Sequence, residues 1–188
     1  MNIDTILEGL KCKEHKYISR AISIIDNNDL LKSDILDAIS SSSHKSIRIG
    51  ITGPPGAGKS SITNQLIKKF RSDNKSVCAL LVDPTSPFSN GAVLGDRIRI
   101  NDCYNDKNIF VRSLASRGSK GGLASSIDSI SDIVEYAGFD IILFETVGVG
   151  QVELDVIESV DSVVVVDLWV RNVKALDQQN DASSDVML

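Results

Sequence analysis

The sequence is poor in the residues that build several common kinds of functional site. It has two histidines and three cysteines in 188 residues, and no two cysteines form a Cys-x-x-Cys pair. These counts argue against a histidine-based catalytic triad, a zinc knuckle and a thioredoxin-type site. Three widely spaced cysteines are instead typical of reduced thiols in a reducing compartment.

Two further absences concern partners and location. Asp and Glu number 25 and Lys and Arg 20, so the net charge of −5 argues against binding to nucleic acid or to an anionic membrane. No apolar run approaches the roughly 20 residues that a membrane-spanning helix needs. The N-terminus carries Asp4 and Glu8 and has no apolar signal core, so we expect a cytoplasmic protein.

What the sequence does contain is an alternation of strand and helix patterns. Short apolar runs predict strands at 47–51, 77–82, 109–111, 141–144 and 163–166. Apolar residues at helical spacing predict a helix that carries Ile62, Leu66 and Phe70 on one face. A second helical stripe is ended by Gly138 and consists of Leu123, Ile127, Ile130, Val134 and Ala137. This order predicts an α/β fold with a doubly wound, mostly parallel sheet.

The chain divides into three regions by pattern. Residues 1–45 carry three stripes of apolar residues at helical spacing, which predict an N-terminal helical arm. Residues 46–167 hold the alternating strands and helices of the core. Residues 168–188 form a polar tail in which no helical face is evident.

Residues 53–60 match the P-loop pattern Gly-x-x-x-x-Gly-Lys-Ser/Thr. The glycines let backbone N–H groups curl around a phosphate, and the helix that follows aims its dipole at the same anion. The nucleotide-binding residues predicted here are Gly53, Pro54, Pro55, Gly56, Ala57, Gly58, Lys59, Ser60 and Ser61. Because the match follows a predicted strand and opens a predicted helix, it indicates a P-loop NTPase in which Lys59 neutralises the phosphates and Ser60 binds Mg²⁺.

Acidic residues stand at or near the carboxyl ends of the predicted strands, where ligands bind in a doubly wound sheet. Asp83 and Glu145 each end a strand, and Asp96 lies in a loop. Together with Ser60 they are candidate ligands of a nucleotide-bound Mg²⁺, which prefers oxygen donors. Each acid alone is also compatible with an ordinary polar strand end.

The residues after Glu145 suggest a segment that senses the γ-phosphate. Gly148 offers a backbone N–H for that phosphate, and its flexibility suits a segment that orders in one nucleotide state. Gln151 could position a water for in-line attack, although a surface glutamine is an equally simple interpretation. The candidate catalytic residues are therefore Lys59, Glu145 and Gln151.

Four segments together resemble the GTPase chaperones of methylmalonyl-CoA mutase, the cobalamin-related P-loop G proteins of ArgK type. The segments are 53–61, Val82-Asp83-Pro84-Thr85-Ser86, Leu94-Gly95-Asp96-Arg97 and Phe144-Glu145-Thr146-Val147-Gly148-Val149-Gly150-Gln151. Gly118, Gly121, Gly122 and the helical arm fit the same pattern, so the resemblance covers roughly residues 15–167.

The resemblance implies a homodimeric GTPase that docks on a B12-dependent mutase, gates adenosylcobalamin loading and protects the mutase from inactivation. It also implies that GTP or GDP and Mg²⁺ are bound, with Asp83, Asp96 and Glu145 around the metal and 145–151 as the switch.

The sequence departs from the family pattern near its C-terminal end. No Asn-Lys-x-Asp tetrapeptide for reading guanine occurs, and only 21 residues follow Asp167. The family's C-terminal dimerisation helices are also missing, so we expect a C-terminally truncated chain with weak guanine selectivity. A small P-loop ATPase or kinase, and a non-catalytic fragment that lacks the base-binding loop, are the alternative interpretations.

Overall fold

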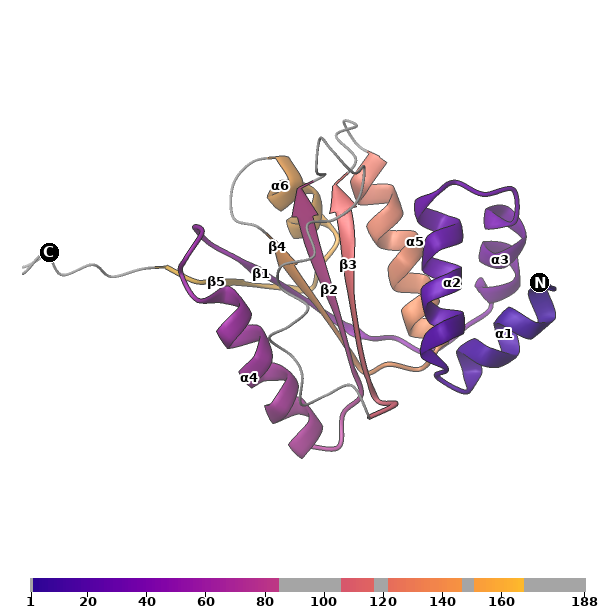
Figure 1. The fold of residues 1–188 in the computed structure, drawn as a ribbon, viewed down its shortest axis with the longest axis horizontal. Helices are drawn as coiled ribbons and strands as arrows, with labels where there is room; N and C mark the ends of the chain where they lie inside the picture. Colours follow the sequence, from indigo (N-terminus) through magenta and orange to yellow (C-terminus); the bar gives the residue numbers. More distant parts are fainter. Residues whose placement is uncertain (1, 85–105, 117–121, 147–150, 168–188) are drawn as a thin grey trace, which may run out of the picture.

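The computed structural model describes residues 2–84, 106–116, 122–146 and 151–167 (Figure 1). Five strands form one sheet, and the order of the strands across it is β3-β2-β4-β1-β5. The strands are β1 (Ile47–Thr52), β2 (Val77–Pro84), β3 (Ile109–Ser116), β4 (Ile141–Thr146) and β5 (Ser162–Val165). All four neighbouring pairs are parallel, so the prediction of a doubly wound parallel α/β sheet is confirmed.

Helices cover both faces of this sheet (Figure 1). One face packs against α4 (Lys59–Ser72), and the other against α5 (Gly122–Tyr136) and α6 (Gln151–Glu158). Successive residues of β2 serve the two layers in turn: Cys78 and Leu80 face α5, while Ala79 lies in the cluster that includes α4. Alternation of side chains along a strand that is covered twice explains why β2 reads as one continuous apolar run.

The predicted helices of the N-terminal arm are α1 (Ile3–Lys11), α2 (His15–Asp26) and α3 (Lys32–Ile39). Their apolar stripes share one hydrophobic cluster with α5 and the strands, and α2 lies alongside α5 (Figure 1). Between the helices the chain turns at Lys13 and Asn28, both in the left-handed region. A polar link also joins this layer to the sheet, because the Arg112 guanidinium of β3 donates to Ser23 Oγ at 2.8 Å.

The buried face of α4 is one position away from the one predicted. The buried residues are Lys59, Thr63 and Ile67, whereas Ile62 is 36% exposed and Leu66 and Phe70 are half-buried. The predicted apolar face of Ile62, Leu66 and Phe70 therefore lies beside the most buried face, and Leu66 and Phe70 pack at the edge of the core. The helix instead turns Thr63 inward, where its hydroxyl donates to Glu145.

Two features at the end of the described chain concern α6 and β5. Helix α6 lies in a region for which the apolar pattern predicted no helix, and it buries Val156 while Leu154 and Ile157 stay exposed. Strand β5 is bonded only to β1 among the described strands, and its Val165 is 69% exposed. Within the described residues, no helix combines the length and hydrophobicity needed to cross a membrane.

Candidate nucleotide-binding site

The P-loop leaves the carboxyl end of β1, and its backbone takes conformations that favour glycine. Gly53, Gly56 and Gly58 have φ angles of +136°, +81° and +91°, and Gly58 is the N-cap of α4. Gly53 has a second constraint, because a Cβ there would lie 1.9 Å from the carbonyl oxygen of Val166. The sequence therefore folds into a loop that leads directly into a helix N-terminus, the arrangement that binds phosphate through backbone N–H groups and the helix dipole.

Lys59 is the first residue of α4, and its side chain folds back across the loop. The residue is buried, and its ammonium donates to the carbonyl oxygens of Gly53 at 2.7 Å and Pro54 at 3.0 Å. The cation is thus held at the mouth of the loop, where it can meet phosphate oxygens. Ser61, also in the first turn of α4, is exposed, as are Pro54, Pro55 and Gly56.

Glu145 reaches this site from the end of β4. Its two carboxylate oxygens accept hydrogen bonds from hydroxyls of α4: Oε1 from Ser60 Oγ at 2.6 Å and Oε2 from Thr63 Oγ1 at 2.7 Å. The structure therefore brings together Ser60 and Glu145, two residues predicted to bind a metal. Thr63 was not predicted, and its neutral, β-branched side chain gave no signal within the sequence.

A second set of hydroxyls lies directly behind the loop. Thr52 Oγ1, at the end of β1, donates to Glu153 Oε1 of α6 at 2.5 Å. Thr146 Oγ1, at the end of β4, lies 3.2 Å from Thr52 Oγ1 and 3.4 Å from the same Glu153 oxygen. Sequence reasoning did not single out these three residues, because their contacts join positions up to 101 residues apart.

Residues 18–172 match the family model described as methylmalonyl-CoA mutase-associated GTPase MeaB. The chain belongs to this family. The resemblance predicted from the P-loop, the acidic strand ends and the 144–151 segment is thereby confirmed, and the family is one of P-loop GTPases associated with methylmalonyl-CoA mutase.

Individual relatives support the same assignment. The chain is 42% identical over 164 residues to a Pyrococcus abyssi protein provisionally named a GTPase. The aligned region covers 87% of this chain and 51% of the relative. It is 33% identical over 159 residues to GTPase ArgK of Escherichia coli, and the alignment covers 82% of this chain and 48% of ArgK. It is 34% identical over 159 residues to the fused isobutyryl-CoA mutase of Nocardia farcinica, and the alignment covers 82% of this chain and 15% of the mutase.

A solved structure is similar over most of the fold. The crystal structure of an LAO/AO transport system kinase superposes with a TM-score of 0.70 at 25% identity, covering 89% of this chain and 51% of that one. The chain spans about half the length of its P. abyssi and E. coli relatives.

Several residues that the MeaB-type pattern singles out are not placed by the structure. Asp96 and Gly148 lie outside the described residues, as do the side chains of Asp83 and Gln151. The backbone of Asp83 pairs with Ala115 at the end of β2, and Gln151 begins α6. Among the described residues, no group of three or more His, Cys, Asp or Glu side chains could hold a metal.

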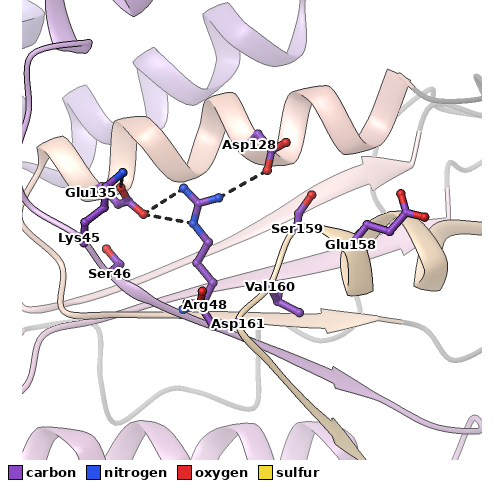
Figure 2. A pocket seen from close by; sticks show the side chains of 9 residues that line it. All are labelled: Lys45, Ser46, Arg48, Asp128, Glu135, Glu158, Ser159, Val160 and Asp161. Carbon is purple, nitrogen blue, oxygen red and sulfur yellow. Dashed lines mark hydrogen bonds and ion pairs between the residues drawn. The ribbon is translucent and has the colours of Figure 1, made fainter.

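A separate polar centre lies at the start of β1 (Figure 2). Arg48 donates to Glu135 Oε1 of α5 from Nε at 3.1 Å and from Nη2 at 2.9 Å, and Lys45 Nζ lies 3.4 Å from the other carboxylate oxygen. The Arg48 backbone N–H also donates to Asp161 Oδ2 at 2.8 Å. The residues around the adjoining hollow of about 520 Å³ are Lys45, Ser46, Arg48, Asp128, Glu135, Glu158, Ser159, Val160 and Asp161.

This second centre joins α5 to the sheet. Arg48 lies 3.4 Å from Asp128 and 3.5 Å from Asp132 in addition to Glu135, so one side chain of β1 contacts three carboxylates of α5. The pKa of Asp132 is raised mainly by burial. The neighbouring carboxylates of Glu135 and Asp128 also raise it, while the positive charge of Arg48 lowers it. The centre lies before the P-loop along β1, and no residue predicted to bind nucleotide belongs to it.

Proposed function

We propose that the chain binds GTP together with Mg²⁺, hydrolyses it, and acts as the nucleotide-dependent chaperone of a cobalamin-dependent methylmalonyl-CoA mutase. The observation that supports this best is the 2.6 Å contact between Ser60 and Glu145 beside the buried Lys59. It joins the first turn of the P-loop helix to the end of β4, where P-loop enzymes combine phosphate and metal binding.

Phosphate binding falls to the loop and to Lys59. The N-terminus of α4 offers backbone N–H groups and a positive dipole end to the β-phosphate. The Lys59 ammonium, which now bonds the carbonyl oxygens of Gly53 and Pro54, would exchange these for phosphate oxygens. That exchange trades neutral acceptors for a charged one and strengthens the hydrogen bonds.

The oxygen donors at Ser60 and Glu145 fit the chemistry of Mg²⁺, which takes one or two protein ligands and completes its shell with phosphate oxygens and waters. Asp83 and Asp96 are the further acids that we propose for this shell. Bound Mg²⁺ would neutralise charge on the β- and γ-phosphates. Gln151 is proposed to orient the attacking water, and Gly148 to donate its N–H to the γ-phosphate.

The mutase partner is proposed from the relatives. The Nocardia farcinica relative is named a fused isobutyryl-CoA mutase, and this chain matches 15% of its length. A segment similar to this chain therefore lies within a polypeptide named for a mutase. We propose that this chain serves a methylmalonyl-CoA mutase or a related B12-dependent mutase, gating cofactor loading and protecting the enzyme from inactivation.

The first experiment is a titration of the purified chain with GTP, GDP and ATP in the presence of Mg²⁺. Binding of GTP with a clear preference over ATP supports the proposal in full, and similar affinities for GTP and ATP would match the weak guanine selectivity expected of this chain. ATP preference would favour an ATPase or kinase, and absence of binding would favour a non-catalytic fragment. Lys59→Ala should abolish triphosphate binding and leave the unfolding midpoint in urea within experimental error. The matched control is Lys69→Ala, an exposed lysine of the same helix paired with Asp73, which should bind nucleotide as the wild type does.

The second experiment tests the partner. Size-exclusion chromatography of the chain with purified methylmalonyl-CoA mutase, loaded with GDP or with a non-hydrolysable GTP analogue, should show a complex whose amount depends on the nucleotide. Equal elution of the mixture and of the separate proteins in both nucleotide states would contradict the chaperone role.

A further inference from the structure

One carboxylate oxygen joins three elements that surround the P-loop. Glu153 Oε1, in the first turn of α6, accepts a hydrogen bond from Thr52 Oγ1 of β1 at 2.5 Å and lies 3.4 Å from Thr146 Oγ1 of β4. Thr146 is 2% exposed and Thr52 is 8% exposed, so both hydroxyls are shielded from water. The two hydroxyls also lie 3.2 Å from each other, and Thr146 Oγ1 lies 3.5 Å from the carbonyl oxygen of Ile51. Glu153 adds to this buried network the partner that comes from α6, and the contact therefore constrains where α6 begins.

The positions of the two threonines tie this contact to the nucleotide site. Thr52 directly precedes Gly53, the first residue of the P-loop, and Thr146 directly follows Glu145. Val166 N–H also donates to Thr52 O at 2.8 Å, so the start of the loop is held by backbone on one side and by Glu153 on the other. Residues 147–150 lie, along the chain, between the two ends that Glu153 fastens.

We propose that Glu153 is a positioning residue that holds the start of α6 to the ends of β1 and β4 and thereby sets the preference of the site for nucleoside triphosphate over diphosphate. This inference rests on the proposed function, in which Gly148 donates to the γ-phosphate. A diphosphate has no γ-phosphate and would make no contact with Gly148. A triphosphate would also depend on the stretch of chain between Thr146 and α6, and Glu153 joins α6 to Thr146.

In this contact the Glu153 carboxylate acts as a hydrogen-bond acceptor, and its negative charge is not required. No lysine or arginine of the described segments pairs with Glu153, and its partners are two neutral hydroxyls. The amide oxygen of glutamine can accept the same hydrogen bond. Glu153→Gln is therefore expected to keep the function that Glu153→Ala loses, which separates positioning from general electrostatics.

The test is a comparison of the dissociation constants for GDP and for a non-hydrolysable GTP analogue. Glu153→Ala should weaken the triphosphate about tenfold, or about 1.4 kcal/mol, and change GDP affinity by less than about twofold. Glu153→Gln should stay within about threefold of wild type for both ligands. Equal weakening of both ligands by Glu153→Ala, or a Glu153→Gln variant as weak as Glu153→Ala, would overturn the proposal.

The donor side of the contact gives a second, independent measurement. Thr52→Val should reproduce the effect of Glu153→Ala, while Thr52→Ser, which keeps the hydroxyl, should not. The double variant Glu153→Ala/Thr52→Val should be no weaker than either single variant, because both remove the same hydrogen bond. Additive losses would contradict the assignment. If Glu153→Ala does not fold, the Thr52 pair decides the question.

A readout without nucleotide separates this inference from the proposed function. Amide hydrogen exchange over residues 151–158 should be faster in Glu153→Ala than in wild type and unchanged in Glu153→Gln and in the control Glu158→Ala, an exposed residue of the same helix. If the wild type binds no nucleotide, the proposed function fails and so does the triphosphate preference. If it binds both nucleotides and exchange in Glu153→Ala is unchanged, only the role of Glu153 fails.

Discussion

Glu135 and Glu145 are both buried, at 4% and 8% exposure, but different kinds of partner stabilise their carboxylates. Glu135 is paired with the guanidinium of Arg48 and the ammonium of Lys45. Glu145 is held by the hydroxyls of Ser60 and Thr63, and no lysine or arginine of the described segments pairs with it. A buried carboxylate needs compensation for lost hydration, and of these two acids only Glu135 is paired with an opposite charge among the residues that the structure describes.

The difference separates a structural acid from one suited to a cation. At Glu135 the charge is already neutralised and fixes α5 on β1. At Glu145 hydroxyls orient the carboxylate and leave its charge available, which is what binding of a metal ion beside a phosphate requires. Burial alone would not have distinguished the two residues, but the nature of their partners does.

The largest effect is expected at the paired carboxylate. Glu135→Ala should lower the free energy of unfolding by about 3 kcal/mol, because it leaves the half-buried Arg48 without its main partner. Urea denaturation measures this change, and GDP affinity should stay within about twofold. The double variant Arg48→Met/Glu135→Leu should be more stable than Glu135→Ala. A double variant less stable than the single would show that the centre is not mainly an ion pair.

The next effect sharpens the comparison at Glu145. Glu145→Ala should slow GTP hydrolysis about 100-fold, or about 2.7 kcal/mol, while GDP affinity changes less than about threefold. Single-turnover hydrolysis at saturating Mg²⁺ measures the rate. Glu145→Gln, which keeps an acceptor for the hydroxyls but loses the charge, should be as slow as Glu145→Ala. Unchanged turnover per bound GTP, with equal loss of GDP and GTP affinity, would instead make Glu145 structural.

The smallest effect is expected at Asp132, one of the three carboxylates of α5 near Arg48. Because the pKa of Asp132 is raised in the folded state, mainly by burial, its ionisation opposes folding. The protonated Asp132 side chain therefore contributes to the stability of the folded state. This contribution is fully present below the ordinary carboxyl pKa and is lost as the pH rises through the raised pKa. Asp132→Asn should therefore gain up to about 0.5 kcal/mol at pH 7, discounted for its half-exposed side chain, and less at pH 5.

Urea denaturation of Asp132→Asn at the two pH values checks this sign. Asp37→Asn, on an exposed part of α3, is the matched control for replacing an aspartate by asparagine. A gain at pH 5 equal to that at pH 7 would contradict the assigned shift.

Much of this architecture follows from local sequence pattern. The apolar run 77–82 predicted a doubly covered strand, and the glycines and lysine of 53–60 predicted the loop at the end of β1, because both signals lie within a few consecutive residues. Helix α6 gave no such signal, since two of its apolar residues, Leu154 and Ile157, face outward. Glu153 and Thr63 could not be found from sequence, because their roles depend on partners brought close only by the parallel sheet.

The close approach of Gly53 to Val166 has a consequence for how such a sequence could change over time. A side chain at Gly53 would collide with backbone that follows β5, so the first glycine of the phosphate motif is required by the sheet itself. Gly56 and Gly58 have no atoms near a would-be Cβ, and only their backbone angles favour glycine there. A descendant that gave up nucleotide binding could therefore lose Lys59 and later Gly56, yet it would retain Gly53 as a trace of the ancestral loop.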